Sequence, residues 1–237
     1  MTKESAKRGV VTGAGSGIGR EIARQLAAEG WSVLAVDVKP DPIKALADEA
    51  GGTIKPFAAD VAADGSAEKI IAAAGEQLGG LDLLVNNAGC SWVGAFVDMP
   101  TEKIDFVLNL NVRGLMLLCR EAIGLLRSSA RGQIINVASV GAHLPMETIA
   151  VYCASKAAVL QFSRVLAKEL APEKIRVDVL SPAGTDTAMF ETVGVDIDRS
   201  LLVPAPDMAR MAVLMTQWPE GLDVGEVLTQ KRFSPYP

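Results

Sequence analysis

The sequence contains a single histidine, His143, and this scarcity excludes several kinds of site. Zinc sites and histidine-based nucleophilic triads both depend on this residue type. The three cysteines, Cys90, Cys119 and Cys153, form no CxxC or cysteine/histidine motif, and no GxSxG motif precedes an expected helix. We therefore expect no metal site, and free thiols in a reducing compartment. His143 is expected on a loop as an ordinary polar residue, with a place beside the substrate as the alternative.

Positive charge and long apolar runs are also scarce. The formal net charge is −5 and the isoelectric point is about 5.0, whereas binding to nucleic acid or anionic lipid requires a basic surface. The first residues, MTKESAKRG, are polar, and no later stretch approaches the roughly 18 uninterrupted apolar residues of a membrane span. These observations predict a cytoplasmic protein with small-molecule partners that binds neither nucleic acid nor membrane.

The hydrophobic residues that are present favour one packed α/β domain. They make up 49% of the 237 residues, and aromatic residues only 5%, so Ala, Val, Leu and Ile must fill the core. Short apolar runs alternate with amphipathic segments of helical length, which is typical of repeated βαβ units and a parallel sheet covered on both faces. We therefore predict a single domain over residues 1–237.

This alternation predicts about seven strands and the helices between them. The strands are expected at residues 9–12, 32–37, 54–60, 81–87, 132–139, 175–181 and 226–229. The helices are expected at residues 18–29, 42–50, 65–78, 101–127 and 151–171. Gly30 is expected to cap the end of the first helix, and Pro172 to close the last, because a proline cannot continue the hydrogen-bond ladder.

Residues 183–206 are less periodic, and we predict that they form a mobile loop near the strand ends that covers the substrate. Arg199 is the only basic residue between positions 188 and 206, so an apolar, weakly charged substrate is favoured over an acidic one. Packing of the loop itself is the alternative role for its apolar residues. They are Met189, Phe190, Val193, Val195, Leu201 and Leu202.

A glycine-rich stretch, TGAGSGIG at residues 12–19, follows a predicted strand and opens a predicted helix. Backbone N–H groups at such a turn can approach a pyrophosphate at the positive end of the helix. The G-x-x-x-G-x-G spacing differs from the G-x-G-x-x-G of the larger dinucleotide-binding dehydrogenases, and a plain tight turn is the alternative. The residues that we predict to bind a cofactor here are Gly13, Ser16, Gly17, Ile18 and Gly19.

Acidic residues end the next two predicted strands. Asp37 lies close to the offset of roughly 20 residues at which a carboxylate accepts from the adenosine ribose hydroxyls. A carboxylate there repels a 2′-phosphate, and the glycine turn carries no Lys or Arg to offset it, so we predict NAD rather than NADP. Asp60 is expected to accept from the adenine amino group, with Val61 beside the ring. Solvated aspartates at strand ends are the alternative.

The stretch VYCASK, residues 151–156, places Tyr152 and Lys156 on one face of a predicted helix. A half-buried tyrosine with a lysine that reaches toward solvent would give the same pattern. Tyrosine has a pKa near 10, about 3 units too high for a base at neutral pH, and lowering it needs roughly 4 kcal/mol. An ammonium about 4 Å away contributes on that order at an effective dielectric of 20, so we expect Lys156 to lower the pKa of Tyr152.

Taken together, these motifs resemble those of the short-chain dehydrogenase/reductase family. TGAGSGIG, NNAG at residues 86–89, Asn111 in NVRG, Ser139 in NVAS, and Tyr152 with Lys156 in YCASK match the family pattern in order, over nearly the whole chain. The resemblance implies a doubly wound, Rossmann-like α/β fold with an about seven-stranded parallel sheet and helices on both faces. It also implies a nicotinamide cofactor and a catalytic tetrad.

The resemblance assigns a role to each member of this tetrad, Asn111, Ser139, Tyr152 and Lys156. Tyr152 exchanges a proton with the alcohol or ketone oxygen, and Ser139 donates a hydrogen bond to that oxygen. Lys156 supports Tyr152, and both contact the nicotinamide ribose. Asn111 holds a water that connects Lys156 to solvent.

Further cofactor contacts are implied at two loops. Asn87, Ala88 and Gly89 of NNAG are expected to pass close to the adenosine ribose, with a plain turn as the alternative. Thr187 falls where the family has a threonine that binds the carboxamide of the cofactor. Pro182 is followed by alanine where the family has glycine, which leaves the path of this loop open. The C-terminal TQKRFSPYP replaces the family's Asp-Gly-Gly, so contacts made there in other members are not expected here.

We therefore predict an NAD-dependent oxidoreductase that interconverts a secondary alcohol, or a diol, and a ketone. The alternatives are an NADP-dependent reductase of the 3-oxoacyl type, against which Asp37 counts, and a non-enzymatic NAD-sensing protein, against which Tyr152 and Lys156 count. The family often forms homotetramers through the helices near 101–127 and 151–171, so we expect a homo-oligomer, a dimer or tetramer. Residues of these helices that could serve either a partner or the protein's own sheet are Leu115, Leu117, Leu118, Val159, Phe162 and Val165.

Overall fold

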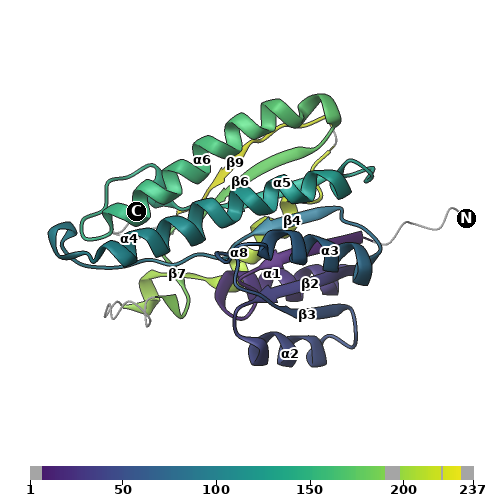
Figure 1. The fold of residues 1–237 in the computed structure, drawn as a ribbon, viewed down its shortest axis with the longest axis horizontal. Coiled ribbons are helices and arrows are strands. Elements are labelled where there is room, and N and C mark those ends of the chain that lie inside the picture. Colours follow the sequence, from purple (N-terminus) through teal and green to yellow (C-terminus); the bar gives the residue numbers. More distant parts are fainter. Residues whose placement is uncertain (1–6, 190–197, 220, 231–237) are drawn as a thin grey trace, which may run out of the picture.

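A seven-stranded parallel sheet forms the centre of the computed structural model, which describes residues 7–189, 198–219 and 221–230 (Figure 1). The strand order is β3-β2-β1-β4-β5-β6-β9, and every neighbouring pair is parallel. The predicted sheet is confirmed, with small differences at the strand ends. The strands are β1 (Lys7–Thr12), β2 (Trp31–Asp37), β3 (Ile54–Ala58), β4 (Leu83–Asn86), β5 (Gln133–Val137), β6 (Arg176–Ser181) and β9 (Glu226–Leu228).

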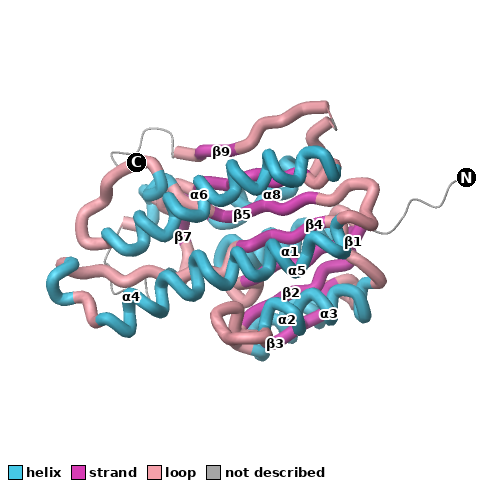
Figure 2. The backbone as a smooth tube through the Cα atoms, turned by 45° about the horizontal axis from the view of Figure 1, so that its top comes forward, coloured by secondary structure: helices cyan, strands magenta, loops and turns pink. Residues whose placement is uncertain are grey.

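Helices cover both faces of the sheet, as Figure 2 shows for α5 and α6 on one side. One face is covered by α1 (Gly17–Ala28), α2 (Pro40–Glu49) and α8 (Ala205–Met215). The other is covered by α3 (Ser66–Leu78), α5 (Leu115–Leu126) and α6 (Ala150–Leu170). Before α5 come α4 (Thr101–Leu108) and a π-helical segment, Asn109–Gly114. The predicted doubly wound, Rossmann-like architecture is therefore confirmed.

The strands form because their side chains alternate between two apolar layers. In β1, Val10 packs into the cluster under α3, α5 and α6, whereas Val11 packs into the cluster under α1, α2 and α8. In β2, Leu34 and Ala35 divide in the same way, and all four side chains are 0% exposed. Each such burial contributes about 1.5–3 kcal/mol for a Val or Leu, which explains why near-continuous apolar runs become strands here.

The chain reverses its direction of winding between β1 and β4. From β1 it passes outward to β2 and β3, and then crosses back to β4 on the other side of β1. In open parallel sheets, ligands bind outside the carboxyl ends of the strands at such a switch point. The glycine turn after Thr12 and the NNAG stretch, which begins at the last residue of β4, both lie at this point.

The first and last predicted helix ends are confirmed. Helix α1 buries Ile22, Ala23 and Leu26, and the chain then turns at Gly30, whose φ of +82° is the left-handed conformation that glycine adopts without strain. Helix α6 ends at Leu170, and Pro172 lies in the 3-10 turn that follows.

The remaining segments differ from the sequence expectation in three respects. The expected continuous helix over 101–127 is interrupted by the π-helical segment, in which Gly114 packs against Val61. Helix α8 was not predicted. Within the expected loop at 183–206, β7 (Thr185–Asp186) pairs with β8 (Val203–Pro204), and Phe190, Val193 and Val195 lie outside the described residues. Leu202 is 5% exposed and packs near Gly184, so it belongs to the protein's own packing.

Some helical residues could serve, on sequence alone, either a partner or the protein's own sheet, and the structure places them partly in the core and partly on the surface. Leu115, Leu118 and Val159 are buried in the protein's own core, and Leu117 and Phe162 pack against it. Val165 is 46% exposed. Across the described ranges, no helix is both long enough and apolar enough to cross a membrane.

Candidate active site

The glycine turn joins the end of β1 to the start of α1. Gly13 and Gly17 have φ values of +66° and +54°, which L residues with side chains rarely adopt. Ser16, the N-cap residue, makes no side-chain hydrogen bond to the helix, and the first turn of α1 contains no acidic residue. Ile18 points the other way and packs against the core under α1. The Ala14 N–H donates to the Val36 carbonyl and the Gly15 N–H to Asp37, whereas the first turn of α1 receives no side-chain cap, so this positive helix end is suited to a phosphate.

The NNAG stretch is fastened onto this turn. The hydroxyl oxygen of Thr12 accepts from the N–H groups of Asn87 and Ala88 at 3.0 and 3.1 Å, and Asn87 Nδ2 donates to the Thr12 carbonyl at 3.0 Å. A Cβ on Gly13 would lie only 2.8 Å from Asn87 Nδ2. The two loops thus need a glycine where they meet, and Thr12 is a residue that the sequence analysis did not single out.

Asp37 lies beside the glycine turn at the end of β2. Its Oδ2 accepts from the Gly15 N–H at 2.9 Å, and its Oδ1 accepts from the Lys39 N–H at 2.9 Å. A Cβ on Gly15 would come within 2.8 Å of this carboxylate. The carboxylate is therefore held by two backbone donors at the edge of the switch point.

Asp60 and Val61 follow β3 on the same edge. Asp60 is exposed, and its Oδ1 accepts from the Ala62 N–H at 2.9 Å. Val61 is 7% exposed and packs against Gly114 of the π-helical segment. The side chain of Val61 thus belongs to the core while its backbone lies near the strand ends.

The four residues of the expected tetrad come from three elements that converge beyond β4 and β5. Tyr152 and Lys156 lie on α6, Ser139 lies just past the end of β5, and Asn111 lies in the π-helical segment. Lys156 is 5% exposed, and its Nζ donates to the Val137 carbonyl at 2.8 Å. The same Nζ lies 5.8 Å from the centre of the Tyr152 ring.

The pKa values of the pair differ from the sequence expectation. Burial raises the pKa of Tyr152 above its ordinary value, against the opposing effect of a hydrogen bond with Ser139. Burial lowers the pKa of Lys156 to about 8. The expected lowering of the Tyr152 pKa by Lys156 was therefore wrong for the protein alone, because desolvation disfavours both charged forms and the Lys156 ammonium is bonded to a backbone carbonyl.

Asn111 is buried, and its amide makes a closed set of hydrogen bonds. Its Oδ1 accepts from the Cys90 N–H at 2.9 Å, and its Nδ2 donates to the Cys90 carbonyl at 2.9 Å and to Ser155 Oγ at 3.0 Å. A Cβ on Gly89 would lie 3.2 Å from Asn111 Oδ1 and 3.4 Å from Lys156 Nζ. Because both amide hydrogens of Asn111 are already used, the water that is expected at this residue would not be held by its side-chain N–H groups.

Thr187 lies next to the glycine turn despite the unusual Pro-Ala sequence before it. The Pro182 carbonyl accepts from the Val140 N–H at 2.9 Å, which anchors the start of the loop beside the segment that carries Ser139. A Cβ on Gly17 would lie 3.0 Å from Thr187 Cγ2. The loop after β6 therefore returns to the turn where the cofactor is expected.

Two of the cysteines lie close to Tyr152, whereas His143 is turned toward β9. Cys90 and Cys153 both influence the ionisation of Tyr152, and burial raises the pKa of the Cys90 thiol to about 11. Cys119 is 1% exposed and lies in the core. His143 Nε2 lies 2.6 Å from Glu226 Oε1, so this ring is held by the edge strand. All three thiols are free.

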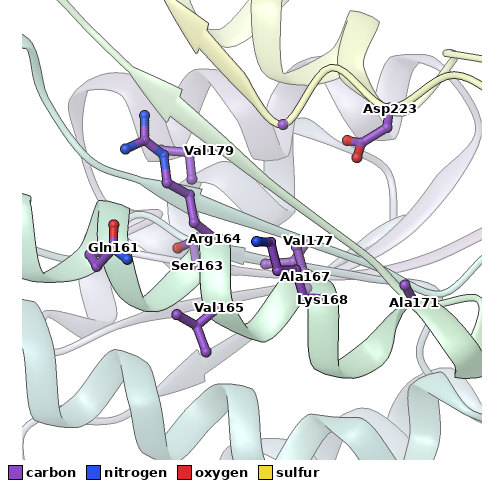
Figure 3. Close-up of a pocket in the computed structure, with 11 residues that line it drawn as sticks. Gln161, Ser163, Arg164, Val165, Ala167, Lys168, Ala171, Val177, Val179 and Asp223 are labelled. Carbon is purple, nitrogen blue, oxygen red and sulfur yellow. The ribbon is translucent and has the colours of Figure 1, made fainter.

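A hollow elsewhere on the molecule involves none of the predicted site residues among those that the structure describes. It has a volume of about 410 Å³ and lies between α6, β6 and the chain before β9 (Figure 3). Its wall includes Arg164, Lys168 and Asp223. The convergence of the tetrad, the glycine turn and Asp37 therefore identifies the candidate site more directly than cavity volume does.

The residues at the switch point fit a nicotinamide dinucleotide. The uncapped start of α1 suits a pyrophosphate, and Asp37 offers acceptor oxygens where the adenosine ribose is expected. The space beside Gly89, which a Cβ would fill, lies between Asn111 and Lys156. This cradle is consistent with a flat ligand that passes from the glycine turn to the tetrad. The described part of the chain holds no cluster of three or more His, Cys, Asp or Glu residues that could bind a metal ion.

Comparisons with known proteins agree with this geometry. The family model described as short chain dehydrogenase matches residues 7–197. An uncharacterized oxidoreductase of Staphylococcus epidermidis is 33% identical over 227 residues, which cover 96% of this chain and 98% of that protein. Oxidoreductase UcpA of Salmonella typhimurium is 34% identical over 96% of this chain and 88% of its own.

Solved structures share the fold. A 3-ketoacyl-(acyl-carrier-protein) reductase from Brucella melitensis, complexed with NADH, superposes with a TM-score of 0.87 at 31% identity, over 94% of this chain and 95% of that one. An alcohol dehydrogenase from Thermococcus sibiricus, complexed with 5-hydroxy-NADP, gives a TM-score of 0.86 at 22% identity, over 95% and 96% of the two chains. The second likeness concerns the fold alone.

Proposed function

The chain belongs to the short-chain dehydrogenase family, and from this premise we propose that it is an NAD-dependent oxidoreductase that interconverts a secondary alcohol, or a diol, and a ketone. The observation that carries the proposal is the convergence of Ser139, Tyr152 and Lys156, together with Asn111, at the carboxyl ends of β4 and β5. These residue types can exchange a proton with a substrate oxygen and stabilise its charge.

Tyr152 is the proton-transfer group in this proposal. Its phenol gives a proton to the carbonyl oxygen of a ketone, and in the reverse direction its phenolate takes the hydroxyl proton of an alcohol. The nicotinamide ring, when bound, supplies or accepts the hydride. Ser139, whose interaction with Tyr152 favours the phenolate, donates a hydrogen bond to the same substrate oxygen. Because burial raises the pKa of Tyr152, its phenol is protonated at neutral pH and is suited to donate a proton in the reductive direction.

Lys156 supplies positive charge that is sensitive to pH. With a pKa of about 8, its ammonium is mostly charged at neutral pH and is held by the Val137 carbonyl. A charged Lys156 stabilises a Tyr152 phenolate, and a neutral one does not. Activity in the oxidative direction therefore depends on the balance between these two groups. Both side chains also face the ribose of the cofactor in this proposal.

The preference for NAD rests on Asp37. Its carboxylate is fixed by the Gly15 and Lys39 N–H groups, so it cannot easily turn away from an additional phosphate. Two negative groups about 4 Å apart repel by roughly 4 kcal/mol at an effective dielectric of 20. A 2′-phosphate on the adenosine ribose is therefore disfavoured.

The reaction of a 3-oxoacyl reductase is the second candidate, and the likeness to the Brucella melitensis reductase favours it. That protein is complexed with NADH, so a 3-oxoacyl substrate would not require NADP. A non-enzymatic NAD-sensing role is disfavoured by the presence of both Tyr152 and Lys156.

An uncharged substrate is favoured by the side chains around Tyr152 and Ser139. A Cβ on Gly141 would lie 3.3 Å from Cys153 Sγ, 3.5 Å from Ser139 Oγ and 3.6 Å from Met146 Sδ. The sulfur atoms of Cys153 and Met146 are polarisable and weakly polar, and they suit an apolar or aromatic surface. We therefore expect ketones and alcohols with apolar substituents to react faster than acidic ones.

We also propose that the protein is a homo-oligomer. Phe106 and Leu108 of α4 are 48% and 40% exposed, and Val165 of α6 is 46% exposed. Helix α4 and the chain before it extend beyond the sheet at the left of Figure 1. Exposed apolar residues on neighbouring helices are typical of an interface. Light scattering coupled to size exclusion measures the mass of the assembly.

The test of the proposed activity is a spectrophotometric panel. Purified protein is mixed with NAD or NADP and secondary alcohols, diols and hydroxylated rings, and with the reduced cofactors and ketones or 3-oxoacyl thioesters. We expect turnover with NAD and an apolar alcohol or ketone. Turnover of 3-oxoacyl thioesters alone would favour the second candidate. Cofactor binding without turnover of any class would contradict the proposed activity.

A further inference from the structure

Ser155 lies on α6 directly before Lys156, and its side chain is 0% exposed. Its hydroxyl donates to the backbone carbonyl of Tyr152 at 2.7 Å and accepts from Asn111 Nδ2 at 3.0 Å. A serine hydroxyl has one proton, so its single donation goes to the carbonyl and a lone pair meets the amide. Ser155 thus joins the turn of α6 that carries Tyr152 to the π-helical segment.

The other polar atoms of the Asn111 side-chain amide are also hydrogen-bonded. Asn111 exchanges two hydrogen bonds with the backbone of Cys90, both at 2.9 Å, and its remaining N–H goes to Ser155. Three segments therefore meet at one amide: the loop after β4, the π-helical segment and α6. Each of these segments carries part of the candidate site.

We propose that Ser155 is a positioning residue that holds Tyr152 and Lys156 in register with Asn111 and the Cys90 segment. The proposal rests on the proposed function, because register matters most where a substrate and a cofactor must meet Tyr152. The space to be kept is small: a Cβ on Gly89 would lie 3.2 Å from Asn111 Oδ1 and 3.4 Å from Lys156 Nζ. A shift of α6 against the π-helical segment would change this space directly.

Loss of the Ser155 hydroxyl has a defined local consequence. The second Asn111 N–H would lose its acceptor in a buried place, where an unpaired donor is unfavourable. The amide would then rotate or bind a water, and its two hydrogen bonds to the backbone of Cys90 would weaken. Misplacement of reacting groups by about 1 Å can reduce a rate by about a hundredfold.

The same helix offers a matched control in Ser163. Its Oγ donates to the Val159 carbonyl at 2.7 Å and accepts from Asn136 Nδ2 at 2.8 Å, and it is 1% exposed. Ser163 therefore has the same pair of hydrogen bonds, about two turns further along α6, and lines the hollow in Figure 3. Ser163→Ala removes an equivalent hydroxyl without touching a residue that we place in the site.

The experiment compares Ser155→Ala, Ser163→Ala and Ser155→Thr in the full chain. The readouts are the thermal unfolding temperature, kcat and its pH profile with the best substrate of the panel, and hydrogen exchange at the Cys90 amide. We expect both alanine variants to lose similar thermal stability. Ser155→Ala alone should lower kcat about ten- to a hundredfold, shift the pH profile and speed exchange at Cys90. Ser155→Thr, which keeps a hydroxyl, should restore most of kcat.

Equal effects of Ser155→Ala and Ser163→Ala on kcat and on Cys90 exchange would overturn the proposal. If wild-type protein turns over no substrate, the proposed function fails, and Cys90 exchange still decides whether Ser155 positions the segment. If Ser155→Ala does not fold, Ser155→Cys replaces it, because a thiol is close in size and a weaker hydrogen-bonding group. Unchanged Cys90 exchange in that variant would likewise overturn the proposal.

Discussion

Gly19, in the first turn of α1, is the position where one added methyl group should separate cofactor binding from folding. A Cβ on Gly19 would overlap the carbonyl oxygen of Gly13 and the Nδ2 of Asn87, and would lie 2.8 Å from the carbonyl carbon of Gly13. These neighbours cannot rotate away, because one is backbone and the other is bonded to Thr12 and Gly13. Gly19→Ala must therefore displace the glycine turn or the helix.

Two opposing effects set the magnitude. Replacing glycine by alanine in a helix stabilises it by about 1 kcal/mol, whereas overpacking costs about 1–3 kcal/mol. The net loss in the free energy of unfolding should therefore be about 0–2 kcal/mol, and the protein should still fold. The displaced turn should bind reduced nicotinamide cofactor at least about tenfold more weakly, which corresponds to about 1.4 kcal/mol.

The assay is a fluorescence titration with NADH together with thermal unfolding. Gly124→Ala is the matched control, since Gly124 is exposed on α5 and a Cβ there would meet nothing within 4 Å. This control should gain about 1 kcal/mol of stability and keep wild-type affinity. A folded Gly19→Ala protein that binds NADH as wild type does would refute the assignment of the glycine turn to the cofactor.

Three further predictions concern charge. Asp37→Ser removes the carboxylate that opposes a 2′-phosphate, so the ratio of kcat/KM for NADP to that for NAD should rise at least about tenfold; an unchanged ratio would count against the role of Asp37. Lys156 has a pKa of about 8 in the fold against 10.5 ordinarily, so the unfolded chain binds more protons between these values. The contribution of Lys156 to the free energy of unfolding should therefore rise by about 3 kcal/mol as pH increases through that window. It is measured as the difference in unfolding free energy between wild type and Lys156→Met in denaturant, and a difference that does not change with pH would contradict the reasoning. Burial raises the pKa of Glu226, but hydrogen bonds from Ser181 and His143 bring it below its ordinary value. The stability that Glu226 contributes should be present above that ordinary value and be lost as pH falls through the pKa of the folded state. The unfolding temperature of Glu226→Gln should therefore fall less steeply at acid pH than that of wild type.

The sheet and most helices could be predicted because local pattern and tertiary burial agree there. Helix α8 could also have been predicted, because Met208, Ala209, Ala212 and Val213 recur at helical spacing and are all buried. Pro204 and Pro206 do not oppose this helix, because a proline at its start is compatible with the first turn. The π-helical segment has no comparable signal, because its geometry depends on contacts with distant residues.

The candidate site, too, could be predicted from sequence only in part. The positions of the glycine turn, Asp37 and the Tyr152–Lys156 pair follow from sequence spacing. The ionisation of that pair does not, because it depends on burial and on the Val137 carbonyl, which only the fold brings to Lys156. Ser155 was also missed, since a serine within a helix gives no sign of which distant amide it meets.

The most direct test of the central claim is the rate of NADH formation or consumption by Tyr152→Phe, with NADH affinity measured on the same protein. This change removes the phenolic oxygen and keeps the ring. We predict that kcat falls by about a hundredfold or more, within the range of general acid–base catalysis, while NADH still binds. A Tyr152→Phe protein that retains wild-type kcat would contradict the account.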